Sequence, residues 1–235
     1  LTSGGDTGKY LTELLIKETV KPEIIPVNAW TRENLSVVDT QSNLQYRFGM
    51  PSNGLQNEEL TEIKSTLDKC LKNNDILVIS GSLPEQVAPD FYATLIKQLS
   101  PKNIKIVIDT SGPALTEALK EKVFLIKPNQ RELAQLAGKE FLSSTEQEAF
   151  ALEIVKSGKA QYVIVSLGAR GAFMASKEGV VYQSTPSISV KSTIGAGDSM
   201  VAGLIYAIKN DFPVQDILKW GVACGVATTM NEGTN

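Results

Sequence analysis

Four consecutive residues, Gly195, Ala196, Gly197 and Asp198, combine bare backbone with a carboxylate. The apolar run 200–207 that follows has helical spacing, so the small residues lie just ahead of a helix start. Amides at a helix N-terminus lack an intrahelical acceptor and, together with the helix dipole, attract an anion. A carboxylate in this place would compete with the anion, unless it faces a hydroxyl group to which a phosphoryl group is passed. The pattern therefore suggests phosphoryl transfer, although N-capping is an equally frequent use of an Asp such as Asp198.

The composition excludes several classes of chemistry. The chain has 235 residues, 42% of them hydrophobic, and no histidine, which excludes Ser-His-Asp and Cys-His catalysis and His-ligated zinc. A net charge of −3 with scattered basic residues argues against nucleic acid as a partner. Cys70 and Cys224 lie in apolar helical patterns and are predicted to be buried thiols, as in a reducing, cytoplasmic compartment. No apolar run reaches membrane-spanning length, so no membrane partner is predicted.

Polar residues follow each of four short apolar runs, and these runs must position them. The runs 76–79, 104–108, 123–126 and 162–165 are mostly separated by helical segments, a pattern that predicts a parallel sheet covered on both faces. Their carboxyl ends carry the segments 80–82, 109–112, 127–129 and 166–171. Open α/β sheets bind ligands at this edge. With the loop 195–198, five polar segments are therefore expected to form one site.

Other segments show different periods. Residues 34–39 and 44–48 alternate apolar and polar side chains around the polar turn 40–43, which predicts a hairpin with one face to be covered. We expect this face to pair with a second copy of the chain, giving a homodimer. Helices are predicted over about 7–17, 58–71, 199–209 and 214–230, and a meander over 172–182.

The motifs in combination resemble the ribokinase-like (PfkB) carbohydrate kinase family. The segments that carry the resemblance are 30–34, 45–51, 78–84, 107–112, 127–132, 165–168, 192–200 and 231–234. The resemblance implies an α/β fold with a three-layer αβα Rossmann-like core, a mostly parallel sheet and a small β lid. It assigns residues 1–30 and 52–235 to the core and residues 31–51 to the lid hairpin.

The implied reaction is transfer of a phosphoryl group from ATP to a phosphorylated sugar. Within the family, the 6-phosphofructokinase branch is the most similar, which implies conversion of fructose 6-phosphate to fructose 1,6-bisphosphate. Asp198 would be the general base, and the amides of Gly195, Ala196 and Gly197 would form the anion hole. The 1-phosphofructokinase and tagatose-6-phosphate kinase reactions remain alternatives, as does a non-catalytic domain that binds MgATP. A dinucleotide oxidoreductase is disfavoured, because no Gly-x-Gly-x-x-Gly joins an early strand to a helix.

The resemblance also implies binding residues. For ATP they are Lys127, Asn129, Ser166, Gly168, Ala169, Gly171, Thr193, Val222 and Val226. Asn129 and Glu132 would hold Mg²⁺ through water, whereas Glu132 alone is more typical of a first-turn carboxylate and the two valines are as typical of a core. Arg32 would bind the 6-phosphate and Ser82 the sugar, although most arginines are simply solvated. Ser192, Ile194, Thr228, Asn231 and Gly233 resemble a K⁺ site.

The chain departs from the family pattern at its two ends. Family members begin with a strand that carries a sugar-binding Asp, and they close with a further helix. Neither is found in the 235 residues. We therefore expect this sequence to be an interior portion of a kinase, whose sugar site lacks its anchoring carboxylate.

Overall fold

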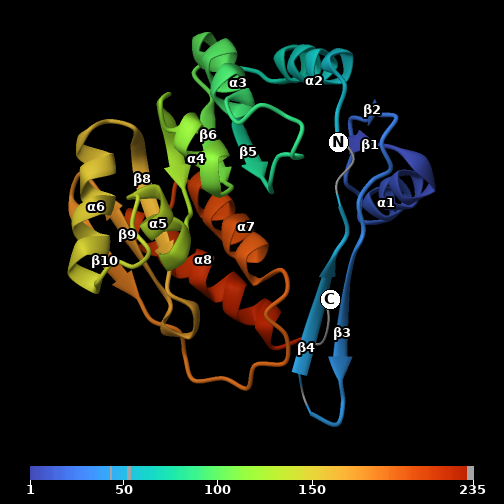
Figure 1. The fold of residues 1–235 in the computed structure, drawn as a ribbon. Helices are drawn as coiled ribbons and strands as arrows, with labels where there is room; N and C mark the ends of the chain where they lie inside the picture. The colour runs from blue at the N-terminus through green and yellow to red at the C-terminus, as the bar shows by residue number, and fades with distance from the viewer. Residues whose placement is uncertain (43, 52–53, 232–235) are drawn as a thin grey trace. The chain divides into compact units, whose positions relative to one another are not determined.

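The computed structural model describes residues 1–42, 44–51 and 54–231 (Figure 1). By its internal contacts the chain divides into two compact units. Unit 1 comprises Leu1–Leu71 and Leu83–Ala88, and unit 2 comprises Lys72–Ser82 and Pro89–Asn235.

A six-stranded sheet forms the centre of unit 2, in the order β10-β9-β8-β7-β6-β5. Its strands are β5 (Ile76–Ser80), β6 (Lys105–Asp109), β7 (Val123–Ile126), β8 (Ala160–Ser166), β9 (Ala172–Ser176) and β10 (Gly179–Gln183). The first four are parallel, as their continuous apolar runs predict, because a strand buried on both faces needs no polar side. The predicted meander adds β9 and β10 as antiparallel strands of the same sheet.

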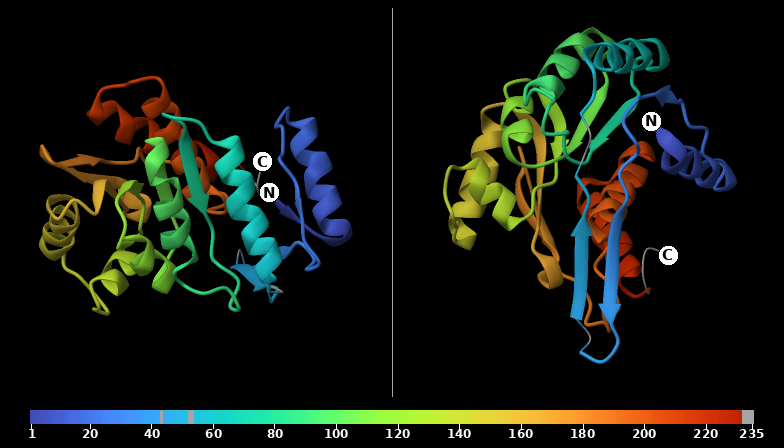
Figure 2. Two further views of the ribbon diagram at one scale, coloured as in Figure 1. Left: turned by 90° about the horizontal axis from the view of Figure 1, so that it is seen from above. Right: turned by 45° about the vertical axis from the view of Figure 1, so that its right-hand side comes forward.

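Helices cover both faces of this sheet, which gives the predicted three-layer αβα arrangement (Figure 2). One face carries α3 (Phe91–Leu99), α4 (Gly112–Ala118), α5 (Gln130–Leu136) and α6 (Ser144–Lys156), with short 3₁₀ turns at Ser100–Lys102 and Gly168–Arg170. The opposite face carries α7 (Ala196–Lys209) and α8 (Val214–Thr229).

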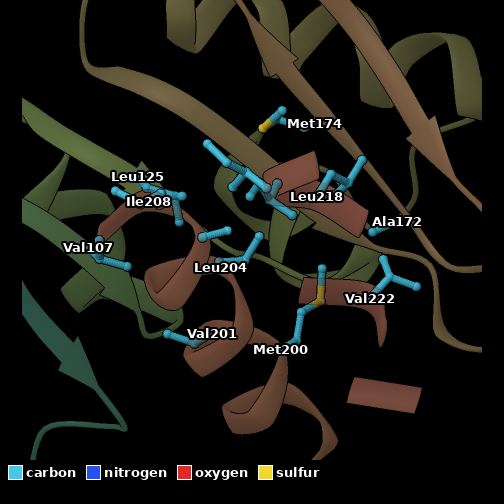
Figure 3. Packing of buried hydrophobic residues seen from close by; sticks show 13 residues of the cluster. Val107, Leu125, Ala172, Met174, Met200, Val201, Leu204, Ile208, Leu218 and Val222 are labelled. Atoms are coloured by element: carbon cyan, nitrogen blue, oxygen red, sulfur yellow. The ribbon is translucent and has the colours of Figure 1, made fainter. Parts of the chain in front are cut away.

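The core under α7 and α8 is made by alternate residues of the strands. Val107, Leu125 and Ile164 point to this face, where Leu204 and Leu218 are almost fully buried against them (Figure 3). Burying one such leucine is worth roughly 1.5–3 kcal/mol, so this contact fixes both helices on the sheet.

Glycines allow α7 and α8 to approach each other closely. A Cβ at Gly203 would lie 2.6 Å from the Trp220 carbonyl oxygen, and one at Gly221 would lie 2.6 Å from Leu204 Cδ2. Either methyl group would push the helices apart. The two helices are therefore closely packed, and this packing supports the segment 191–196, where α7 begins.

Apart from the predicted hairpin, the described part of unit 1 contains two helices and two short strands. They are β1 (Thr2–Ser3), α1 (Gly5–Lys17), β2 (Ile25–Pro26) and α2 (Asn57–Cys70), with β1 and β2 pairing in parallel. The buried Glu59 carboxylate accepts the amides of Asn28 and Gln56, each at 2.7 Å, and so ties the segment after β2 to the start of α2. The prediction that Cys70 is buried is wrong: it ends α2 one position off the apolar stripe and is exposed, and Cys224 is only partly buried.

The predicted hairpin is also part of unit 1. Its strands are β3 (Asn34–Asp39) and β4 (Leu44–Gly49). Leu35 opposes Phe48 and Val37 opposes Tyr46, so apolar side chains share one face, and all four are 43–55% exposed. The limits of the lid at residues 31 and 51 stay a prediction.

Among the residues that the structure describes, no helix has both the length and the apolar character needed to span a bilayer.

Candidate active site

The carboxyl ends of the parallel strands of unit 2 meet at one edge and are joined there by backbone hydrogen bonds. The amide of Gly81 donates to the Asp109 carbonyl at 3.0 Å, and that of Lys127 donates to the Ile108 carbonyl at 3.2 Å. The amide of Ser166 donates to the Pro128 carbonyl at 3.1 Å. The polar segments that follow β5 to β8 are therefore neighbours, where ligands of open α/β sheets bind.

The loop before α7 presents the first amides of the helix. Gly195 is the N-cap and has φ +76°, a conformation that glycine adopts without strain. The Ser199 amide donates back to the Gly195 carbonyl at 2.8 Å, and the Ala196 amide has only a long contact of 3.5 Å with the Thr193 carbonyl. Asp198 lies in the first turn of α7 and is exposed, not turned into the core. The Asp198 carboxylate is therefore accessible at the same helix start as the bare amides.

A buried ion pair lies beside this loop. The Lys127 Nζ atom is 3.2 Å from Asp109 Oδ1, and their side chains are only 7% and 17% exposed. A Cβ built at Gly197 would lie 3.6 Å from Lys127 Nζ, which places the ammonium group against the anion loop. A cation beside helix-start amides reinforces their attraction for a phosphate.

Burial raises the pKa of the Asp109 carboxyl above its usual value, and the Lys127 ammonium group opposes that rise. The charges of Glu132 and Asp198 raise the pKa of Asp109 further, which places these carboxylates in its neighbourhood. Asp109 is not among the site residues predicted from the sequence. Its position at the end of β6, in one of the five polar segments, was the available signal.

A cavity of about 470 Å³ opens next to the start of α7. Among the residues predicted for ATP, those lining it are Ser166, Gly168, Ala169, Gly171, Thr193, Val222 and Val226, and Ala196 and Gly197 of the anion loop line it too. Lys127 and Asn129 are not in its lining. Val222 is also a member of the core cluster, so it packs in the core and lines the cavity; its contact with ATP stays a prediction.

The cavity has a further wall that was not predicted from the sequence. Residues of the segment after β10 line it, namely Thr185, Pro186, Ser187, Ile188 and Val190. The Thr185 hydroxyl group donates to the Ala169 carbonyl, which fastens this segment to the opposite wall. Gly171 has φ +98°, and a Cβ there would lie 2.0 Å from the Gln183 carbonyl oxygen. Only glycine allows the chain after β10 to pass this close.

Asn129 and Glu132 begin α5 and form a capping box. Asn129 Oδ1 accepts the Glu132 amide at 2.9 Å, and Glu132 Oε2 accepts the Asn129 amide at 2.8 Å. Glu132 thus places a carboxylate in the first turn of α5, where it interacts favourably with the helix dipole, as one of the two expectations for it stated. Its second oxygen and the remaining lone pair of Asn129 are hard donors of the kind that suits a largely hydrated Mg²⁺. Within the described ranges, no cluster of three or more Asp, Glu, Cys or His side chains could hold a metal ion.

The candidates for the K⁺ site lie where the loop before α7 meets the end of α8. The buried Ser192 accepts the Ile194 amide on its hydroxyl group at 3.2 Å, and its own amide contacts the Thr229 carbonyl at 3.3 Å. The Asn231 amide donates to the Thr228 carbonyl at 3.2 Å. Gly233, the fifth candidate, lies outside the described residues.

The two candidates for the sugar phosphate belong to different units. Ser82 follows β5 in unit 2 and is exposed. Arg32 is exposed in unit 1, directly after Thr31. Thr31 is held on both sides: its hydroxyl group accepts the Gly4 amide at 3.1 Å, and its carbonyl accepts the Thr7 hydroxyl at 2.7 Å. The backbone that presents Arg32 is therefore fixed.

Comparison with known proteins gives the family of the chain. The model of the pfkB family carbohydrate kinases matches residues 3–235. The ATP-dependent 6-phosphofructokinase isozyme 2 of Escherichia coli is 38% identical over 99% of this chain and 75% of its own, and the 1-phosphofructokinase of Borreliella burgdorferi is 36% identical over 97% of this chain and 73% of its own. The crystal structure of E. coli phosphofructokinase-2 in complex with potassium superposes with a TM-score of 0.95 at 38% identity, over 99% of this chain and 75% of that one. The chain thus belongs to the pfkB family of carbohydrate kinases and has their ribokinase-like α/β fold.

Proposed function

We propose that this chain transfers the γ-phosphoryl group of ATP to the C1 hydroxyl group of fructose 6-phosphate, giving fructose 1,6-bisphosphate. The observation that carries the proposal is the exposed Asp198 carboxylate in the first turn of α7, beside bare amides and the Lys127 ammonium group. The cavity that accepts the nucleotide in this proposal ends at the same loop.

Each group has a role in the proposed reaction. Asp198 removes the proton from the attacking hydroxyl group, a contribution typically worth ~10²–10⁴-fold in rate. The amides of Ala196 and Gly197 stabilise charge on the transferring phosphoryl group, and in a comparable anion hole one donor is worth on the order of 10²–10³-fold. Lys127, held by Asp109, adds a fixed positive charge at the same place. Asn129 and Glu132 would hold Mg²⁺ through water, and the bound ion would neutralise charge on the ATP phosphates.

The acceptor is proposed from the chemistry of two side chains. The Arg32 guanidinium is a planar fork of donors that suits a phosphate dianion, and Ser82 can hydrogen-bond a sugar hydroxyl group. The family relatives carry the names of both 6- and 1-phosphofructokinases, so the position of the phosphate on the acceptor is the point that an assay must decide.

Two further assignments belong to the proposal. The backbone around Ser192, Ile194, Thr228 and Asn231 would hold K⁺, and a bound cation would order the anion loop, in keeping with the potassium complex of the E. coli relative. The exposed apolar face of the β3–β4 hairpin pairs with a second copy of the chain, because a two-stranded hairpin with such a face is only marginally stable alone.

The test is a panel of acceptors with MgATP: fructose 6-phosphate, fructose 1-phosphate, tagatose 6-phosphate and unphosphorylated fructose. Asp198→Asn should abolish turnover and leave ATP affinity, measured by calorimetry, nearly unchanged. Asp216→Asn is the matched control, because Asp216 occupies the first turn of α8 at the end remote from the anion loop.

The outcomes are distinct. If the chain preferred another phosphorylated sugar, that sugar would replace fructose 6-phosphate as the proposed acceptor, and the proposed mechanism would stand. Nucleotide binding without turnover on any acceptor would make the chain a non-catalytic MgATP-binding domain. Normal turnover in Asp198→Asn would refute the assignment of the base.

A further inference from the structure

The last turn of α8 is joined to the first turn of α7 through two hydroxyl groups. Thr228 Oγ1 lies 2.6 Å from Ser199 Oγ and 3.2 Å from the Cys224 carbonyl oxygen. Ser199 follows Asp198 directly, and its amide donates to the Gly195 carbonyl at 2.8 Å. One side chain of α8 thus contacts the turn that carries Asp198.

Further contacts make this junction tight. A Cβ at Gly225 would lie 3.0 Å from the Ala196 carbonyl oxygen, and a Cβ at Gly195 would lie 3.7 Å from Thr228 Cγ2. The Thr229 carbonyl accepts the Lys191 amide at 2.8 Å. The end of α8 therefore touches the anion loop before, at and after its glycine N-cap.

The first turn of α7 offers few side chains for packing. Gly195 and Gly197 lack side chains, Ala196 has only a methyl group, and the Asp198 side chain is exposed. Met200 packs in the apolar core. The Ser199–Thr228 hydrogen bond is a polar side-chain contact that holds this turn against α8.

We propose that Thr228 is a positioning residue, which acts through Ser199 to hold the Asp198 carboxylate and the helix-start amides in register with the transferring phosphoryl group. This inference rests on the proposed function of the same site. A misplacement of about 1 Å in a positioned catalytic group can cost ~10²-fold in rate, so loss of one such contact is expected to lower kcat by about 10- to 100-fold.

The test compares Thr228→Val, which removes the hydroxyl group and keeps the shape, with Thr228→Ser, which keeps it. Ser199→Ala removes the acceptor. Thr116→Val is the matched control, because the Thr116 hydroxyl group donates to the Gly112 carbonyl of its own helix. Amide hydrogen exchange of Ser199 and Met200, the first residues of α7 whose amides have an acceptor one turn back, and steady-state kinetics are measured for each variant, with thermal unfolding as a check on folding.

We expect Thr228→Val and Ser199→Ala to increase exchange of the Ser199 and Met200 amides and to lower kcat, with a smaller change in KM for ATP. The double variant should be no worse than either single one. Thr228→Ser should restore both readouts, and Thr116→Val should alter neither.

Unchanged exchange in Thr228→Val would overturn the inference, whether or not the protein turns over. Increased exchange with unchanged kcat would also overturn it, because the contact would then be structural only. If the variants showed the exchange response but the wild-type chain turned over no acceptor, the proposed function would fail and the holding of the α7 turn by Thr228 would be supported.

Discussion

Replacing Gly197 by alanine should stabilise the protein and inactivate it. Gly197 is the second residue of α7, is exposed, and its backbone does not need the left-handed conformation that Gly195 adopts. A Cβ there meets only Lys127 Nζ, at an ordinary contact distance of 3.6 Å. The methyl group is therefore accommodated, yet it occupies the space between the ammonium group and the anion-loop amides.

The magnitudes follow from these contacts. Alanine in place of glycine in a helix is worth about 0.5–1 kcal/mol, because it lowers the entropy of the unfolded chain. For a protein of this size, 1 kcal/mol corresponds to a shift in Tm of roughly 2–4 °C. Loss of access to one amide donor should lower kcat by on the order of 10²–10³-fold.

Stability is measured by urea unfolding followed by circular dichroism, and activity by coupled assay with MgATP and fructose 6-phosphate. The matched control is Gly203→Ala in the same helix. Its Cβ would lie 2.6 Å from the Trp220 carbonyl oxygen, so the variant should lose about 1–3 kcal/mol of stability through overpacking.

One result would refute the reasoning. If Gly197→Ala were more stable and fully active, the space beside Lys127 would not be the place of the phosphoryl group. A less stable Gly197→Ala variant would instead contradict the geometry of the helix start.

Three further predictions concern the ion pair, the acceptor and the hairpin. Because burial raises the pKa of Asp109 in the folded state above its usual 3.8, its contribution to stability is lost as the pH rises, so the free energy of unfolding of wild type relative to Asp109→Asn should fall as the pH rises above 3.8; a rise would contradict the burial argument. Arg32→Ala should raise KM for the phosphorylated sugar and not for ATP, with the exposed Arg131→Ala as control; an equal rise in both KM values would remove Arg32 from the acceptor site. Phe48→Lys should convert a dimer into a monomer in analytical ultracentrifugation, whereas Gln45→Lys on the polar face should not; a dimer in both variants would exclude the apolar face as the contact.

The sequence predicted the parallel sheet well because its inner strands β6, β7 and β8 are largely buried on both faces and are therefore unbroken apolar runs, and the edge strand β5 is also apolar although Val78 is 37% exposed. The same reasoning placed the candidate site, since polar residues at the carboxyl ends of β5 to β8 must meet at one edge. It predicted Cys70 wrongly, because one helical position separates the apolar stripe of α2 from its exposed side.

Other features of the candidate site could not be predicted from a pattern in the sequence. The segment 185–190 lines the cavity with a mixture of small, polar and apolar residues, and its place is set by the close passage at Gly171 and not by any period. Asp109 is recognisable only once Lys127 is seen to be buried beside it, because the pairing joins residues from two different strand ends. The Thr228–Ser199 contact likewise depends on how α7 and α8 cross.

The capping box of α5 has a consequence for the evolution of the site. Asn129 and Glu132 are immobilised by each other's backbone amides before any cation arrives, so little side-chain entropy remains to be lost on binding one. Replacing either residue would release the helix start and loosen the proposed cation ligands together. Substitution of Asn129 or Glu132 would therefore affect both the stability of the helix start and the proposed cation site. A compensating change elsewhere in the sequence would have to restore both.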